Sequence, residues 1–459
     1  MIAEKVPRFI VEAEKEAVAG KILVGVWKPA EGDNAIALGW FPNTDEDLAG
    51  YRLFFSFDNE AWSLFRDQTV LTPNVTDTTI SGTINRDAYF RLTAVDDAPV
   101  PNESVHSDIY GMSNGQSFLG KVLIVDGFDR TDGGWREPFH HFVFTHGQAI
   151  IANQFSFDTV PNEAIEDSLT YLNDYDAVFW NLGDESTLDE TFSAREQCLV
   201  SDYLAKGGSL FVSGSEVAWD LDQNSGSGAA GPEDEAFLND FLKTEFISNN
   251  AETVSVSGAA GSMFEGLSFN FGQIPYPVPE PDVIAPTSGA IPCLEYYGGQ
   301  IAGIQYAGTF GESETGGKLV YLAFPFETIA QESVRDELIG RVFEFFFNIT
   351  SVDLEQKNSL PTEFSLSQNY PNPFNPETSI QYYIPVTSVI SIKIFNSLGQ
   401  TVRTLINGIV DAGVHKTVWD GRDDSNNPVT SGVYLVKLHA ENKTRDKEYQ
   451  ETRRVVLLR

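Results

Sequence analysis

The chain has 459 residues, which is too long for one core of ordinary size, so about three domains are expected. Hydrophobic residues make up 42% and aromatic residues 12%, which excludes a disordered chain. Asp and Glu number 66 against 30 Lys and Arg, giving a net charge of −36. This excess excludes nucleic acid and anionic membrane surfaces as partners, because phosphate binding depends on clustered Lys and Arg.

The sequence offers few ligands for a metal or cofactor. Its two cysteines, Cys198 and Cys293, are too few for a disulfide framework or a cysteine metal cluster. No metal site and no cofactor are therefore expected, and no apolar run is long enough for a membrane span. Residues 1–25 lack the apolar core of a signal peptide, so we interpret them as the tail of an upstream region or a linker.

Residues 26–116 have an all-β pattern. Alternating apolar and polar residues predict strands over 34–43, 50–58 and 87–97, with turns at the spacing of a β-sandwich. Trp40 and Tyr89 are expected to pack in its core. The strands around Trp40, "GYRLFFS", "YFRLTAVD" and "ESVHSDIYG" resemble a fibronectin type III domain, a fold that mostly serves as a spacer or binding module.

Residues 119–349 change to alternating strands and helices. "GKVLIVDGFD", "YDAVFWNLGDES" and "SLFVSGSE" are apolar strands, and "SAREQCLVSDYLAKGG" is a helix with a Gly-Gly stop. "KLVYLAFPFETI" and "ESVRDELIGRVFEFFF" supply a closing strand and helix. Strands of this kind joined by helices predict a parallel sheet covered on both faces, with functional groups at the carboxyl ends of the strands.

The "AKGG" helix, the turn "SLFVSGSE" and "AFPFETI" with Arg335 make this segment resemble the class I glutamine amidotransferase-like superfamily, which has a flavodoxin-like fold. The superfamily places a nucleophilic cysteine at the turn after the "SLFVSG" strand. This chain has "SGSE" there, with Ser215 as the nearest substitute. We therefore do not carry the glutaminase activity over, and whether the domain is an enzyme stays open.

Ser215, Glu216, His146 and Asp184 are the candidate catalytic residues. A serine nucleophile needs a nearby base and oxyanion donors, and a sharp strand-to-helix turn supplies such donors. The competing interpretations are that Ser215 caps a helix, that Asp184 and Glu185 are solvated loop residues, and that His140 and His141 lie on the surface. A metal pair between these histidines and Asp126 or Asp129 is the remaining alternative.

Residues 350–360 are polar and indicate a linker, and 361–459 return to an all-β pattern. Strands are predicted in "SIQYYIP", on both sides of the "NSLGQ" turn, on both sides of "DGRDDSNNP", and in "QETRRVVLL". About a hundred residues with this many strands fit a small immunoglobulin-like β-sandwich. The overall expectation is a multidomain chain with two β-sandwiches flanking an α/β domain.

Five ordered motifs make residues 361–459 closely resemble the type A carboxyl-terminal sorting domain of the type IX secretion system. They are "YPNPFNP", "IKIFNSLGQTVRTL", "AGVHKTVWDGRD", "SGVYLVKL" and a basic, apolar tail. The residues that carry the resemblance are Tyr370, Pro371, Asn372, Pro373, Phe374, Asn375, Pro376, Gly399, Trp419, Asp420, Gly421, Gly432 and Tyr434.

This resemblance implies a secreted or outer-membrane surface protein of a bacterium, with the type IX secretion machinery as its partner. A cell-surface polysaccharide or protein is the kind of ligand expected for the other modules. The alternative function is an extracellular hydrolase, or the accessory part of an enzyme that degrades polysaccharide or cell wall.

Overall fold

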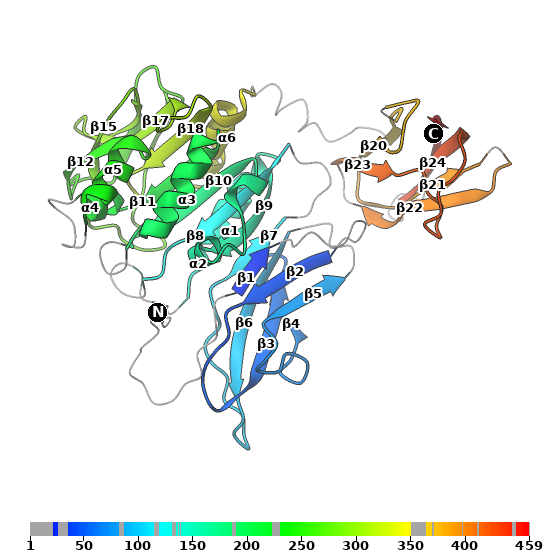
Figure 1. Ribbon diagram of the computed structural model, residues 1–459, viewed down its shortest axis with the longest axis horizontal. Coiled ribbons are helices and arrows are strands. Elements are labelled where there is room, and N and C mark those ends of the chain that lie inside the picture. Colours follow the sequence, from blue (N-terminus) through cyan, green and yellow to red (C-terminus); the bar gives the residue numbers. More distant parts are fainter. Residues whose placement is uncertain are drawn as a thin grey trace. The chain divides into compact units, whose positions relative to one another are not determined.

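A computed structural model describes residues 22–25, 35–81, 87–113, 119–130, 135, 137, 139–185, 190–222, 230–349, 364–369, 371–396, 398–410, 413–442 and 447–458. These residues form two compact units, which we call unit 1 (up to Ile349) and unit 2 (364–458). The protein is mostly β-sheet and is built from more than one domain (Figure 1). The predicted linker 350–360 lies outside the described residues, as does the predicted tail 1–25 apart from 22–25.

The amino-terminal part of unit 1 is a β-sandwich. One sheet holds β1 (Ile22–Gly25), β2 (Ala35–Trp40) and β5 (Asp77–Ser81). The other holds β3 (Leu48–Ser56), β4 (Ser63–Arg66), β6 (Ala88–Asp96) and β7 (Tyr110–Met112). Because β1 pairs with β2, residues 22–25 extend the sandwich sheet and do not belong to a separate tail.

Trp40 lies in the core of this sandwich, as expected, with its ring 5.6 Å from that of Tyr51. Tyr89 does not, because neighbouring residues of a strand point to opposite faces and Phe90 takes the inward place. The Tyr89 ring packs instead 4.8 Å from Phe144 of α1 (Phe142–Ala152).

The rest of unit 1 is built on a sheet with a parallel centre. Its parallel strands are, in spatial order, β9 (Ser156–Pro161), β8 (Lys121–Asp126), β10 (Ala177–Gly183), β11 (Ser209–Gly214) and β18 (Gly316–Leu322). Antiparallel β17 (Ile301–Thr309) follows β18. The carboxyl ends of the parallel strands therefore meet at one edge of the sheet.

Helices cover both faces of this sheet. The face of Ile124, Phe179 and Phe211 packs against α1 and α6 (Glu332–Phe347). The face of Val125, Trp180 and Val212 packs against α2 (Asn162–Glu166), α3 (Ala194–Ala205), α4 (Val217–Leu221) and α5 (Pro232–Asp240). Short helices η1 (Leu172–Asp174) and η2 (Phe326–Thr328) follow α2 and β18. None of the described helices is long and apolar enough to span a membrane.

An antiparallel extension, which the sequence patterns did not predict, continues the sheet beyond β17. It contains β12 (Thr244–Ser248), β13 (Ser255–Gly258), β14 (Ser268–Asn270), β15 (Val283–Pro286) and β16 (Ile291–Tyr296). β15 and β16 both pair with β17, and the remaining three strands pair with these two or with each other. The central segment is therefore a mixed sheet.

The sandwich and the α/β sheet are joined through β9. Ser113 N donates to the Phe157 carbonyl at 2.8 Å, and Met112 and Val24 are register partners of Asp158 and Thr159. The buried Thr159 hydroxyl both donates to the Gly111 carbonyl at 2.8 Å and accepts from Gly111 N at 2.7 Å. The two segments predicted as separate domains thus share backbone pairing within one compact unit.

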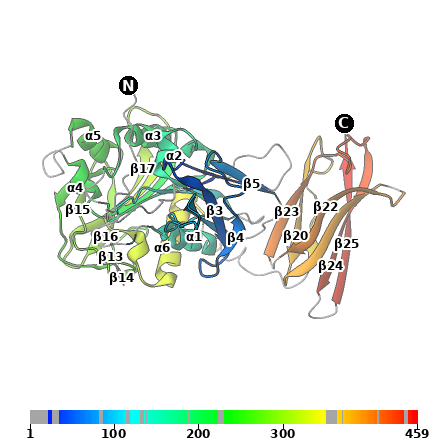
Figure 2. The ribbon, with the colours of Figure 1, turned by 90° about the horizontal axis from the view of Figure 1, so that it is seen from below.

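Unit 2 is a second β-sandwich, seen in Figure 2. One sheet has the order β19 (Ser365–Leu366), β20 (Thr378–Ile384), β23 (Gly413–Trp419). The other has the order β22 (Thr401–Val410), β21 (Ser388–Phe395), β24 (Gly432–Asn442), β25 (Lys447–Leu457). Their inward faces form a core of their own that includes Tyr382, Ile392, Trp419 and Leu438.

Candidate functional site

The loops at the carboxyl ends of the parallel strands bring Ser215 and Asp184 together. Ser215 follows β11 and Asp184 follows β10. The Ser215 hydroxyl donates to Asp184 Oδ1 at 2.8 Å, with the Gly183 carbonyl at 3.5 Å. Both side chains are buried, so the interpretation of Asp184 as a solvated residue is wrong. The contact links the ends of two neighbouring strands.

His146 does not join this pair. It lies on α1, where its Nε2 is 3.5 Å from Glu327 Oε2, and Tyr276 donates to Glu327 Oε1 at 2.5 Å. Within the described residues, the Ser215 hydroxyl has no histidine partner. The arrangement of a nucleophile with an adjacent histidine base is therefore not formed at Ser215.

The sharp turn after β11 is centred on Glu216. Glu216 has φ 58° and ψ 12°, a left-handed conformation that is uncommon outside glycine, and it immediately precedes α4. The turn packs closely against β10 and requires glycine at position 214, because a Cβ there would lie 2.8 Å from Leu182 Cβ. A residue held this way at a strand-to-helix turn occupies the position of the nucleophile in an elbow motif. In this chain that position therefore carries Glu216.

The start of α4 is capped by Asp282, whereas the sequence suggested Ser215 for that role. Asp282 Oδ2 accepts from Ala218 N at 2.8 Å and from Trp219 N at 3.1 Å. Complete burial raises the pKa of Asp282 well above its usual range, and nearby Glu216 and Asp220 add to the shift. The carboxyl group accepts from amide groups that would otherwise face the turn.

The capping role of Asp282 predicts unequal effects of two substitutions. Asp282→Asn keeps an oxygen that accepts from both amides, so the free energy of unfolding should change by less than about 1 kcal/mol. Asp282→Leu leaves two buried N–H groups without an acceptor and should cost about 2 to 4 kcal/mol. Urea denaturation of both variants measures the difference. Equal losses in the two variants would contradict the capping role of Asp282.

Glu185 fixes the loop after β8. Its Oε2 accepts from Asp129 N at 2.8 Å and from Arg130 N at 3.0 Å. Arg130 Nη1 in turn donates to the Asp184 carbonyl at 3.2 Å. Glu185 is buried, which again corrects its assignment as a solvated loop residue. The two carboxyl-end loops are thereby locked together around the site.

His140 lies inside the molecule and not on its surface. Its Nδ1 is 3.3 Å from Asp108 Oδ1, and its Nε2 is 3.0 Å from the Arg130 carbonyl. Both ring nitrogens thus face acceptors, which favours the imidazolium form. Burial alone would lower the pKa of His140, but the carboxylates of Asp108, Asp126 and Asp129 together outweigh it and the pKa is raised. Asp108 comes from the segment leading into β7, so the sandwich contributes a charge to this region.

Asp126 ends β8 beside His140. Burial raises its pKa from 3.8 to about 7, and the neighbouring Asp108 adds to the shift. Asn181 Nδ2 donates to Asp126 Oδ1 at 3.2 Å. No group of three or more His, Cys, Asp or Glu in the described part of the chain has metal-binding geometry. The metal alternative for His140 and Asp126 therefore has no support in this geometry.

The raised pKa of Asp126 predicts that unit 1 loses stability as the pH rises. The folded state keeps a proton that the unfolded chain releases, so the stabilisation is complete below about pH 4 and is lost through about pH 7. The loss should reach up to about 4 kcal/mol, since each pKa unit corresponds to about 1.4 kcal/mol. Urea denaturation between pH 5 and 9 measures it. Asp126→Asn should make the loss of stability with pH smaller, whereas the exposed Asp240→Asn should not.

Sequence reasoning missed Asp108, Tyr276, Asp282 and Glu327. All four are buried, and each contacts a partner at least 32 residues away in the sequence. The one feature of the sequence that relates to these residues is its excess of Asp and Glu. That excess does not distinguish buried carboxylates from exposed ones. They become visible only once the strand order is known.

In unit 2 the predicted motif residues gather around Trp419. The rings of Phe374 and Tyr434 lie 5.3 and 5.0 Å from the Trp419 ring. Gly421 has φ +69°, and a Cβ there would lie 3.3 Å from the Pro376 carbonyl. The motifs from three parts of the sequence therefore meet in one place, with Phe374 and Trp419 in the core. Tyr370 lies outside the described residues.

The 371–376 loop covers one edge of the four-stranded sheet. Phe374 N donates to the Val456 carbonyl at 2.9 Å, and Leu458 N donates to the Phe374 carbonyl at 3.0 Å. Val456 N donates to Asn372 Oδ1 at 2.9 Å. The loop thus satisfies the outer backbone groups near the end of β25, a device that blocks pairing with other chains. Pro371, Pro373, Asn375 and Pro376 are exposed around these contacts.

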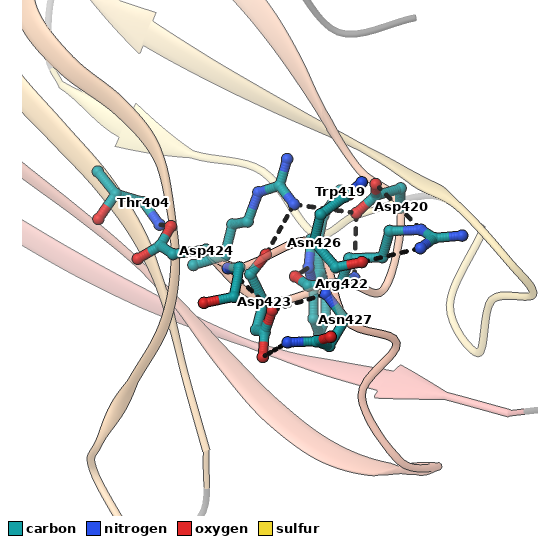
Figure 3. A network of polar contacts seen from close by, with 10 residues as sticks. Thr404, Trp419, Asp420, Arg422, Asp423, Asp424, Asn426 and Asn427 are labelled. Carbon is teal, nitrogen blue, oxygen red and sulfur yellow. Dashed lines mark hydrogen bonds and ion pairs between the residues drawn. The ribbon is translucent and has the colours of Figure 1, made fainter.

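The 420–427 loop covers the opposite edge at β22, as Figure 3 shows. Thr404 N donates to Asp424 Oδ1 at 2.9 Å, and Arg403 Nη1 donates to the Asp423 carbonyl at 2.9 Å. The loop is closed by Asp423 Oδ1, which accepts from Ser425 N and Asn427 N. Asp420 Oδ1 accepts from Arg422 N at 3.0 Å. Gly399, with φ +76°, and Gly432 lie at a turn and a strand start, respectively.

Residues 376–444, most of unit 2, match the FlgD Ig-like domain family. The FlgD structure of P. aeruginosa aligns with 17% of this chain and 61% of its own length, at 22% identity and a TM-score of 0.16. PorZ, an essential bacterial surface component of the type-IX secretion system of Porphyromonas gingivalis, aligns with 22% of this chain and 12% of its own, at 20% identity and a TM-score of 0.15.

Dimeric latent PorU from Porphyromonas gingivalis aligns with 96% of this chain and 34% of its own length, at 9% identity and a TM-score of 0.19. The chain thus spans less than two thirds of each of these three proteins. TM-scores this low establish no shared overall fold. A search of curated proteins finds no match.

Proposed function

We propose that the chain is a bacterial surface or secreted protein whose unit 2 is the sorting signal recognised by the type IX secretion machinery. The observation that carries this proposal is the meeting of the sorting-type motifs in one independent sandwich around Trp419. A sorting domain must fold independently of the passenger protein that precedes it, and unit 2 has its own hydrophobic core. The match of 376–444 to an immunoglobulin-like family agrees with this role.

The charge distribution gives unit 2 a distinct surface. Residues 361–459 contain 11 Lys and Arg and 10 Asp and Glu, whereas the preceding residues contain 19 and 56. Nearly all the negative charge therefore belongs to the passenger. A receptor can distinguish the near-neutral unit 2 from that passenger by electrostatics alone.

A fusion experiment tests whether unit 2 is a sorting signal. Residues 350–459 are placed behind an unrelated passenger with a Sec leader, in a bacterium that has the type IX apparatus. We expect the passenger in the medium or on the cell surface, and in the periplasm when the apparatus is deleted. The matched control carries Trp419→Ala in the fusion and should stay in the periplasm. Retention of the unaltered fusion in the periplasm would refute the proposal.

For the centre of unit 1 we propose an amidotransferase-like domain without glutaminase activity. The order β9–β8–β10–β11–β18 corresponds to the flavodoxin-like order 2-1-3-4-5. The elbow position carries Glu216 where that superfamily has cysteine, and Asp282 occupies amide groups at the start of α4. The amino-terminal sandwich is proposed to be fibronectin-like.

The second candidate function is hydrolysis by carboxylates at this turn. It is favoured by the left-handed backbone of Glu216, because strained residues cluster at functional sites. Assays with nitrophenyl glycosides and esters would test it. Activity that Glu216→Gln lowers at least 100-fold while Glu252→Gln leaves it unchanged would establish the hydrolase, and equal activity in both variants would exclude Glu216.

A further inference from the structure

A row of buried polar side chains crosses three central strands of unit 1. Asp126 of β8, Asn181 of β10 and Ser213 of β11 are register partners across the parallel sheet. Register partners on neighbouring strands point to the same face, so the three side chains lie side by side. Each is at most 3% exposed. Beneath them on the same face lie the apolar Ile124, Phe179 and Phe211.

Two oxygens of this row lack partners. Asn181 Nδ2 donates to Asp126 Oδ1, so the amide is directed along the row. Among the described atoms, neither Asn181 Oδ1 nor Ser213 Oγ has a hydrogen-bond partner. Buried polar atoms in native proteins almost always have a partner, which includes bound water or an ion. The row therefore indicates a small ligand between Asn181 and Ser213.

The surroundings favour positive charge in that ligand. Asp108 and Asp129 lie near Asp126, with the single imidazolium of His140 among them. The open atoms are oxygens, which are the ligands of hard cations. Only one carboxylate belongs to the row, and no cluster of three acidic or histidine ligands occurs in the described residues. Two neutral oxygens beside the single carboxylate of the row suit an ion with one positive charge.

We propose that Asn181 Oδ1 and Ser213 Oγ bind a small monovalent cation, of the size of Na⁺, K⁺ or NH₄⁺. The cation fills the two open acceptor positions, and the carboxylates around Asp126 favour its positive charge. The site lies at the carboxyl ends of the strands but is separate from the Glu216 turn.

Thermal unfolding of the full chain tests this site. The transition of unit 1 is measured at pH 8 in 150 mM NaCl, KCl, NH₄Cl or choline chloride. At least one small cation should raise the midpoint by about 2 to 4 °C relative to choline, which is too large to bind. Equal midpoints in all four salts would show that water fills the row and would overturn the proposal.

Two variants locate the effect. Ser213→Ala removes one proposed ligand and should abolish the cation-dependent difference, and Asn181→Leu should do the same if it folds. The matched control Ser257→Ala changes an exposed serine on β13 and should keep the full difference. A difference that persists in Ser213→Ala would place the cation elsewhere and refute this assignment.

Discussion

Trp419→Ala should unfold unit 2 at a much lower temperature and leave unit 1 unchanged. The indole is fully buried between Phe374 and Tyr434, and its Nε1 donates to the Arg422 carbonyl at 2.9 Å. Truncating such a side chain costs about 3 to 5 kcal/mol, a large part of the stability of a domain of this size. Differential scanning calorimetry should show the unit 2 midpoint falling by about 15 °C or more.

The neighbouring Val418→Ala is the control for this experiment. Val418 lies on the same strand and is 51% exposed, so its truncation should change the free energy of unfolding by less than about 0.5 kcal/mol. A simultaneous fall of both transitions in Trp419→Ala would contradict the independence of unit 2. An unchanged unit 2 transition would contradict the core position of Trp419.

Thr159→Val should destabilise the junction between the amino-terminal sandwich and the α/β sheet. Valine has nearly the shape of threonine but no hydroxyl, so it leaves both the N–H and the carbonyl of Gly111 without their partner. Because each unsatisfied buried group costs about 1 to 3 kcal/mol, the total loss should be about 2 to 5 kcal/mol. Urea denaturation followed by tryptophan fluorescence measures it.

Thr159→Ser keeps the hydroxyl and separates the two causes. It removes only a methyl group, so its loss should be about 1 kcal/mol. If valine and serine variants were equally stable, the hydroxyl would not bridge the two segments. If the valine variant showed a separate transition for the sandwich at lower urea concentration, the contacts at β9 would be the main link between the sandwich and the α/β sheet.

Much of the fold follows from local sequence pattern. The predicted strands at 34–43 and 87–97 contain β2 and β6, and the one at 50–58 covers β3 except for its first two residues. The helix at 193–208 contains α3, which ends before the Gly-Gly pair. The strands on both sides of the "NSLGQ" turn are β21 and β22. These elements have strong periodicity and clear turn residues, which are local properties of the chain.

The remainder depends on pairings between distant residues. The strands β12 to β16 are short and separated by glycine and proline, so their pattern is weak. Helix α1 buries Phe142, His146 and Ile150 on one face, but apolar Phe144 and Ile151 lie outside this stripe, so the contrast between an apolar and a polar face is weak. The sequence pattern predicted Ser215 as the residue at the sharp turn, whereas the structure has Glu216 there. A left-handed backbone conformation follows from packing and is not apparent from the type of residue.

The junction at β9 limits how this protein can be rearranged by recombination. A gene fragment that carried the α/β segment into another protein without residues 108–113 would expose one edge of β9 and leave Asp108 behind. A bare edge strand of this kind invites aggregation. We therefore expect the two segments to be transferred together, whereas unit 2, with a core of its own, can be transferred by itself.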